Sequence, residues 1–221
     1  MEIVKGVFQV DGVNCNVYIL ENAGKLTLID TGLPRSDKKI VKAVEAIGRH
    51  PNDISTILIT HFHVDHVGTL SKMKELTGAK VAVGDADAQI VAGKTMAPKP
   101  KNLMFRALSG VMQAKPVEPD IVLKEGDTVA GLQVISTPGH SNGSISLFDS
   151  ERKVMFVGDA ARFVDGKMQG PPESFTLDMA KAKESIKKLA NYDFEVMLAG
   201  HGQPLMPEAS KKLREFASIL Q

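Results

Sequence analysis

The sequence predicts an α/β fold in which β-sheets are covered by helices in layers. Three observations lead to this prediction. Short apolar segments of strand length are separated by turns, helical stretches with one apolar face lie between them, and strand-rich blocks occur before about residue 85 and after about residue 120. No linker rich in Ser and Gly divides the 221 residues, so we expect a single domain over residues 1–221.

Before residue 85, four segments have the length and apolar content of strands: 17–20, 26–29, 57–59 and 81–83. The first two are separated by a short loop and are expected to form a hairpin. A helix is expected in each of the two later gaps. Ser36 is a candidate N-cap for the first helix, which ends at Gly48. The second helix ends at Gly78, and its apolar face consists of Val67, Leu70, Met73 and Leu76.

After residue 120, five more segments are expected to be strands: 128–129, 132–135, 144–148, 154–157 and 196–198. Two helices are expected in the same part of the chain. The first has an apolar face made of Met179, Ala182, Ile186 and Leu189. The second starts at Pro207, because proline suits the first position of a helix, and buries Leu213, Phe216 and Leu220.

The stretch 86–119 separates the two strand-rich blocks. It contains a polar loop at 93–101, followed by apolar residues at helical spacing over 103–112. One interpretation is a further core helix. The other is a Met-rich flap inserted over a site, because flexible apolar side chains suit adaptable binding surfaces.

Charge and composition limit the partners of the protein. The 27 Lys and Arg residues nearly balance the 26 Asp and Glu residues, so no net field attracts nucleic acid or an acidic membrane. No apolar run reaches the ~18 residues that span a bilayer, and the N-terminus lacks the pattern of a secretory signal. We therefore expect a cytoplasmic protein that acts on a small-molecule substrate, with no nucleic-acid or membrane partner. The oligomeric state stays open.

A cluster of metal-binding residue types follows the strand 57–59. His61, His63, Asp65 and His66 lie within six residues, where the strand gives way to a helix. Side chains two apart in an extended segment point the same way, so His61 and His63 face one side. Imidazole and carboxylate groups suit zinc, and two adjacent metal ions would use all four. Asp65 could instead cap the helix.

Further candidate ligands follow other strands. His140 and His201 are flanked by glycine, which lets the backbone approach a site closely, and Asp159 and Asp30 each follow an apolar strand. Because functional residues collect on loops held by a rigid sheet, we expect these side chains to join the first cluster. His50 has no such context and is interpreted as an ordinary residue at a helix end.

One motif favours a different chemistry. Residues 139–143 match G-x-S-x-G, the nucleophile turn of serine hydrolases, with Ser141, Asp159 and His201 in the corresponding chain order. That turn requires a helix after the serine, whereas 144–148 alternates like a strand. A serine hydrolase is therefore the weaker hypothesis. Cys15 has no partner motif and is interpreted as a packing residue.

Together these blocks resemble those of the metallo-β-lactamase-fold hydrolases, especially glyoxalase II-like and lactonase-like members. The matching segments are Ile29-Asp30-Thr31-Gly32, His61-x-His63-x-Asp65-His66, Thr137-Pro138-Gly139-His140, Gly158-Asp159 and Gly200-His201. The resemblance implies a four-layer αββα sandwich of two mixed β-sheets flanked by helices.

The resemblance also implies a dinuclear centre, with zinc as the expected metal and iron, manganese or a mixed pair as alternatives. The implied ligands are His61, His63 and His140 for one ion, Asp65, His66 and His201 for the other, and Asp159 as a bridge between them. Asp30 is similar to the aspartate that orients the ligands in this family.

Such a centre implies a hydrolase in which a bridging hydroxide cleaves an ester, thioester or lactone. Asp65 is a candidate catalytic base as well as a ligand. An aspartate at 159 is typical of glyoxalase II, lactonase and phosphodiesterase members, and true β-lactamases of the family usually lack it. A single-iron persulfide dioxygenase is the main alternative, because ligand identity alone does not fix the metal. We expect the substrate pocket to be lined by 86–119, Phe163, Met168 and the loop 170–172.

Overall fold

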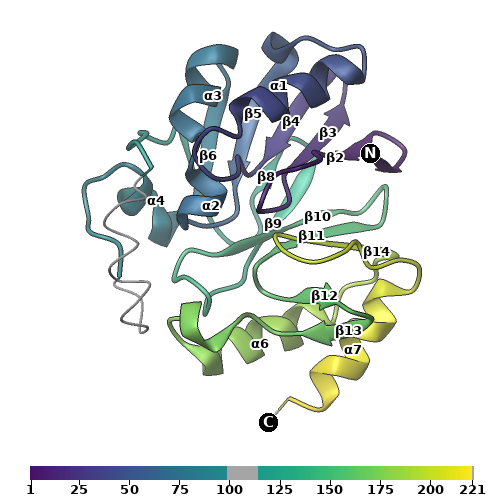
Figure 1. Cartoon of the computed structure of the whole chain (residues 1–221). Helices are drawn as coiled ribbons and strands as arrows, with labels where there is room; N and C mark the ends of the chain where they lie inside the picture. The colour runs from purple at the N-terminus through teal and green to yellow at the C-terminus, as the bar shows by residue number, and fades with distance from the viewer. Residues whose placement is uncertain (99–113, 221) are drawn as a thin grey trace.

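The computed structural model describes residues 1–98 and 114–220, and it has two main sheets packed face to face (Figure 1). In the described part, the larger sheet has seven strands in chain order: β1 (Glu2–Val4), β2 (Val7–Gln9), β3 (Tyr18–Asn22), β4 (Lys25–Ile29), β5 (Ile54–Ile59), β6 (Lys80–Gly84) and β7 (Ile121–Leu123). Strands β1 to β4 pair antiparallel, and β4 to β7 pair parallel. The expected hairpin is therefore β3–β4.

The smaller sheet is also mixed. Its order is β14 (Val196–Ala199), β11 (Val154–Gly158), β10 (Ile145–Asp149), β9 (Leu132–Ser136) and β8 (Thr128–Val129). Only β11 and β14 pair in parallel. A separate hairpin consists of β12 (Arg162–Val164) and β13 (Lys167–Gln169).

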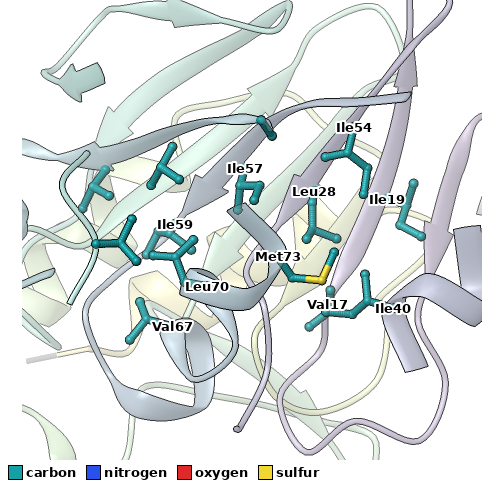
Figure 2. Packing of buried hydrophobic residues seen from close by; sticks show 14 of the residues in the cluster. Val17, Ile19, Leu28, Ile40, Ile54, Ile57, Ile59, Val67, Leu70 and Met73 are labelled. Atoms are coloured by element: carbon teal, nitrogen blue, oxygen red, sulfur yellow. The ribbon is translucent and has the colours of Figure 1, made fainter. Parts of the chain in front are cut away.

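Helices cover the outer face of each sheet. Helices α1 (Asp37–Ala46) and α3 (Leu70–Thr77) pack on the larger sheet, and α6 (Met179–Leu189) and α7 (Ala209–Ser218) pack on the smaller one (Figure 1). Side chains alternate along β5, so Ile57 and Ile59 pack with the residues of the covering helices (Figure 2). Leu58 instead enters the core between the sheets. This arrangement confirms the four-layer αββα prediction.

The expected helix with apolar residues from Val67 to Leu76 is divided into α2 (Val64–Val67) and α3. The loop after β4 inserts at the break. The backbone N–H and the hydroxyl of Thr31 both donate to the carbonyl of His66 at 2.8 Å, and Gly68 N donates to Gly32 O. Leu76 is 39% exposed, so placing it on the buried face was wrong.

Ser36 is the N-cap residue of α1, as expected, although its side chain makes no capping hydrogen bond and its own backbone is already helical. The expected start of the last helix was wrong. Helix α7 starts at Ala209 rather than Pro207, because Glu208 has a positive φ of 60° that a right-handed helix cannot include.

The stretch 86–119 is described in part. Helix α4 (Asp85–Val91) occupies its start, and the expected apolar helix or flap over 103–112 lies outside the described residues. Phe163 and Met168, two of the expected pocket-lining residues, are partly buried and pack against the core under α6 and α7. No helix in residues 1–98 or 114–220 is long and apolar enough to cross a membrane.

Candidate metal centre

The predicted site residues meet at one end of the two sheets. Asp30 and His61 follow the parallel strands β4 and β5, and Asp159 and His201 follow the parallel strands β11 and β14. His140 lies in the loop between β9 and β10. The carboxyl ends of parallel neighbours lie at the same edge, which explains why residues far apart in sequence converge here.

The first group consists of His61, His63 and His140. The ring nitrogens His61 Nε2 and His63 Nδ1 are 3.0 Å apart, and the ring of His140 lies 4.7 Å from that of His61 and 4.6 Å from that of His63. One potential ligand atom from each residue lies within 4.8 Å of the other two, which is close enough for one ion to contact all three.

The second group consists of Asp65, His66 and His201, whose potential ligand atoms also lie within 4.8 Å of one another. Asp159 lies between the two groups. Its Oδ2 is 3.4 Å from His140 Nε2 and 3.5 Å from His201 Nε2, and its Oδ1 is 3.5 Å from His66 Nε2. All seven predicted ligands are therefore brought together. Two of the groups within 4.8 Å match the sets that the resemblance implied, and His61, His66 and Asp159 form a further group that crosses them.

Unsatisfied atoms at the centre of the cluster fit a cation. His66 Nε2, His140 Nε2 and Asp159 Oδ1 are buried without a hydrogen-bond partner. Such atoms are costly unless something compensates for their desolvation. Burial also raises the pKa of Asp159 above its usual value. Imidazole and carboxylate groups around these atoms form a donor set suited to a divalent metal centre.

Hydrogen bonds at the outer nitrogens orient two of the rings. His66 Nδ1 lies 2.8 Å from Asp30 Oδ2, and His61 Nδ1 lies 3.1 Å from Thr60 Oγ1. Asp30 is itself fixed, because it accepts hydrogen bonds from the backbone N–H and the hydroxyl of Thr60. An imidazole that donates through Nδ1 presents the lone pair of Nε2, so Asp30 turns His66 Nε2 toward the cluster.

The protonation states of the first group suit metal binding. Burial lowers the pKa of His61 well below its usual value, that of His63 to about 4 and that of His140 to about 2. Burial alone would raise the pKa of Asp65, but His66 and His201 hold it well below its usual range. At neutral pH the three imidazoles are neutral and Asp65 is ionised, as metal ligands must be.

The cluster is partly exposed, because His63, Asp65, Asp159 and His201 are only partly buried. His61, His66 and His140 are buried, whereas the side chains of Asp65 and His201 are 28% and 34% exposed. The exposed pair is joined by a contact of 3.1 Å between His201 Nε2 and Asp65 Oδ2. Asp65 and His201 are therefore accessible members of the cluster.

Sequence reasoning missed three residues near the cluster. Asn16 holds the backbone that carries His201, since its side-chain amide donates to Ala199 O and Gly202 O at 2.9 Å. Cys15 is more than a packing residue, because its sulfur lies 3.4 Å from His66 Nδ1. Asp87 contacts the two histidine-bearing loops of the first group. All three contacts join segments distant in sequence, and none belongs to a local motif.

The geometry of Ser141 argues against a serine nucleophile. Its hydroxyl is fully buried, donates to Asp87 Oδ2 at 2.7 Å and lies 2.8 Å from the hydroxyl of Ser144. The chain continues into strand β10, as expected, rather than into the helix that a nucleophile turn requires. His50, as expected, has a local role: its Nδ1 accepts the backbone N–H of Asn52 at a short helix, Pro51–Asp53.

The Ser141→Ala variant provides a direct test. We expect kcat at saturating metal to stay within about tenfold of wild type, because the hydroxyl only links loops, whereas loss of a true nucleophilic serine costs about 10⁶-fold. The free energy of unfolding should fall by about 1–3 kcal/mol, since the Asp87 carboxylate loses a donor. Steady-state kinetics and urea unfolding measure both effects. Loss of turnover in a folded variant would restore the serine hypothesis.

Comparisons with known proteins agree with this geometry. Residues 10–201 match the family model described as the metallo-beta-lactamase superfamily. The probable metallo-hydrolase YflN of Bacillus subtilis is 30% identical, over 92% of this chain and 86% of its own length. The human acyl-coenzyme A thioesterase MBLAC2 is 29% identical, over 88% of this chain and 75% of its own. The crystal structure of TTHA1623 in a di-iron-bound form superposes with a TM-score of 0.71 and 27% identity, covering 90% of this chain and 93% of that one.

Proposed function

Because this chain belongs to the metallo-β-lactamase superfamily, we propose that it is a hydrolase that holds two zinc ions and cleaves thioester, ester or lactone bonds. The observation that carries the proposal is the pair of three-residue ligand groups that share Asp159. A single ion would not need both groups. Burial of unpartnered nitrogen and oxygen atoms between them supports the same conclusion.

The proposed ligands form two sets, one for each metal ion. One ion would be held by His61, His63 and His140, the other by Asp65, His66 and His201, and Asp159 would contact both ions. When bound, such ions lower the pKa of water and polarise a carbonyl oxygen. Asp30 contacts His66 Nδ1, which leaves Nε2 facing the cluster, and burial keeps the imidazoles of His61, His63 and His140 neutral.

Asp65 is the proposed proton acceptor. Its carboxylate is ionised, is partly exposed and lies within hydrogen-bond distance of His201 Nε2. A water or substrate at the exposed part of the cluster can therefore contact Asp65. This position allows Asp65 to take a proton from the attacking water, a general-base role that operates at hydrogen-bond distance.

We favour thioesters within the proposed bond classes. A thiolate leaves without being protonated, because thiols have a pKa of about 8.5, so such a substrate needs no acid from the protein. The acyl-coenzyme A thioesterase activity named for the human relative supports the same class. Plain amides fit poorly, because their leaving group must be protonated.

Metal removal tests the proposed function. We expect about two zinc ions per chain by elemental analysis, complete loss of thioesterase activity in EDTA, and recovery when zinc is returned. A panel of acyl-coenzyme A, lactone, β-lactam and phosphodiester substrates defines the bond class. Activity that survives EDTA would contradict the proposal. An iron-loaded protein that consumes oxygen with a persulfide would favour the dioxygenase alternative, and the di-iron form of TTHA1623 justifies assaying iron.

A further inference from the structure

We propose that Asp87 is a positioning residue that sets the spacing of the three-histidine group. Asp87 lies in α4, outside the predicted ligand set, and its side chain is 0% exposed. The proposal rests on the proposed function, because positioning has meaning only if His61, His63 and His140 hold a metal ion. It adds a residue that neither the sequence motifs nor the ligand groups include.

The carboxylate of Asp87 accepts three hydrogen bonds. Its Oδ2 accepts the backbone N–H of Phe62 at 3.0 Å and the hydroxyl of Ser141 at 2.7 Å. Its Oδ1 accepts the backbone N–H of Gly143 at 2.8 Å. Burial raises the pKa of Asp87, and the three donors oppose that rise because they favour the charged carboxylate. Hydrogen bonds to a charged acceptor are shorter and stronger than those between neutral groups.

These donors belong to the two segments that carry the three histidines. Phe62 lies between His61 and His63, in the loop after β5 of the larger sheet. Ser141 and Gly143 follow His140, in the loop between β9 and β10 of the smaller sheet. One carboxylate therefore ties together histidine loops that come from different sheets. A change in its position would move His61 and His63 relative to His140.

Close packing makes this connection stiff. A Cβ atom added at Gly143 would overlap the backbone nitrogen of Asp87 and would lie 2.6 Å from its Oδ1. A Cβ added at Gly84, just before α4, would overlap the carbonyl oxygen of Gly143. Only glycine lets the second loop lie directly on the start of α4. The three hydrogen bonds therefore act over a fixed, short distance.

The chemistry requires a carboxylate rather than an amide of the same shape. Asparagine has one acceptor oxygen, whereas the backbone N–H groups of Phe62 and Gly143 bond to different oxygens of Asp87. In Asp87→Asn, one of these N–H groups would face an NH₂ group and lose its bond. The substitution thus weakens the connection between the two histidine loops without changing side-chain volume.

Cobalt binding to the full chain tests the proposal, with Asp149→Asn as the matched control. Asp149 is also buried, at 3% exposed, and its carboxylate accepts the N–H groups of Glu151 and Arg152 and the Arg152 guanidinium. Metal-free wild type and both variants are titrated with Co²⁺. Affinity is measured by chelator competition, and coordination geometry by the visible spectrum. We expect Asp87→Asn to bind Co²⁺ about 10–100-fold more weakly with an altered spectrum, and Asp149→Asn to match wild type.

The outcomes separate this proposal from the proposed function. Wild type that binds no Co²⁺ would overturn the proposed function. If wild type binds Co²⁺ but the two variants, Asp87→Asn and Asp149→Asn, do not differ in Co²⁺ affinity or spectrum, only the proposed role of Asp87 is overturned. If Asp87→Asn does not fold, Ser141→Ala is compared with Ser146→Ala, a buried serine that bonds Thr137 and Val157 instead. Co²⁺ affinity about 3–10-fold weaker in Ser141→Ala alone supports the proposal, and equal affinities overturn it.

Discussion

Asp159→Asn is expected to lower kcat/KM by at least about 10³-fold, or about 4 kcal/mol of transition-state stabilisation, while the chain stays folded. Asp159 lies within 3.5 Å of ring nitrogens from both ligand groups. An amide keeps the shape but offers one neutral acceptor oxygen in place of two charged ones, so it cannot hold two cations together. Hydrolysis of an acyl-coenzyme A, measured with zinc in excess, provides the test.

Thermal unfolding separates loss of metal from loss of fold. Asp159 Oδ1 is buried without a hydrogen-bond partner, so the metal-free chain should lose little stability when the charge is removed. Wild type should gain stability on adding zinc, because a ligand that binds only the native state raises Tm, and Asp159→Asn should gain much less. Asp149→Asn is the control: its metal-free Tm should fall, and its zinc response should match wild type. If Asp159→Asn turned over substrate at the wild-type rate, Asp159 would not be a part of the metal centre.

The site was predictable because its ligands occupy recognisable places along the chain. A polar residue at the end of a buried strand stands out from the apolar pattern, as His61 does after Ile57–Ile59 and His201 after β14. Parallel pairing then brings such ends to one edge, without any further specification in the sequence. The layered fold followed from the same pattern, since side chains of β5 alternate between the helices and the core between the sheets.

What the sequence left undetermined depends on contacts between distant segments. Asp87 reads as an ordinary acidic residue in the first turn of a helix, and only the folded chain shows two loops bonded to its carboxylate. The break between α2 and α3 arises because Thr31 takes the carbonyl of His66 that a continuous helix would use.

Gly200→Ala is expected to weaken zinc binding strongly without unfolding the chain. A Cβ atom at position 200 would overlap Asp159 Oδ1 and lie 2.6 Å from His66 Cε1. The His66 ring is held by Asp30, so the free end of Asp159 must swing away from the cluster. Rotating one side chain is tolerable for the fold, but it removes the carboxylate that both ligand groups share. We expect zinc affinity and kcat/KM each to fall by at least about 10²-fold, the upper end of what outer-shell changes cost.

Gly170→Ala is the matched control for this prediction. A Cβ there would meet only Ile186 Cδ1, at 3.5 Å, which is ordinary van der Waals contact, so zinc affinity should stay at the wild-type value. Metal content by elemental analysis and Tm of the metal-free chain are measured for both variants. If Gly200→Ala kept two zinc ions per chain, the cluster would have to tolerate displacement of Asp159. Such a result would contradict the proposal that the Asp159 carboxylate holds both ions. Each ion would then be held by its own three-residue group alone.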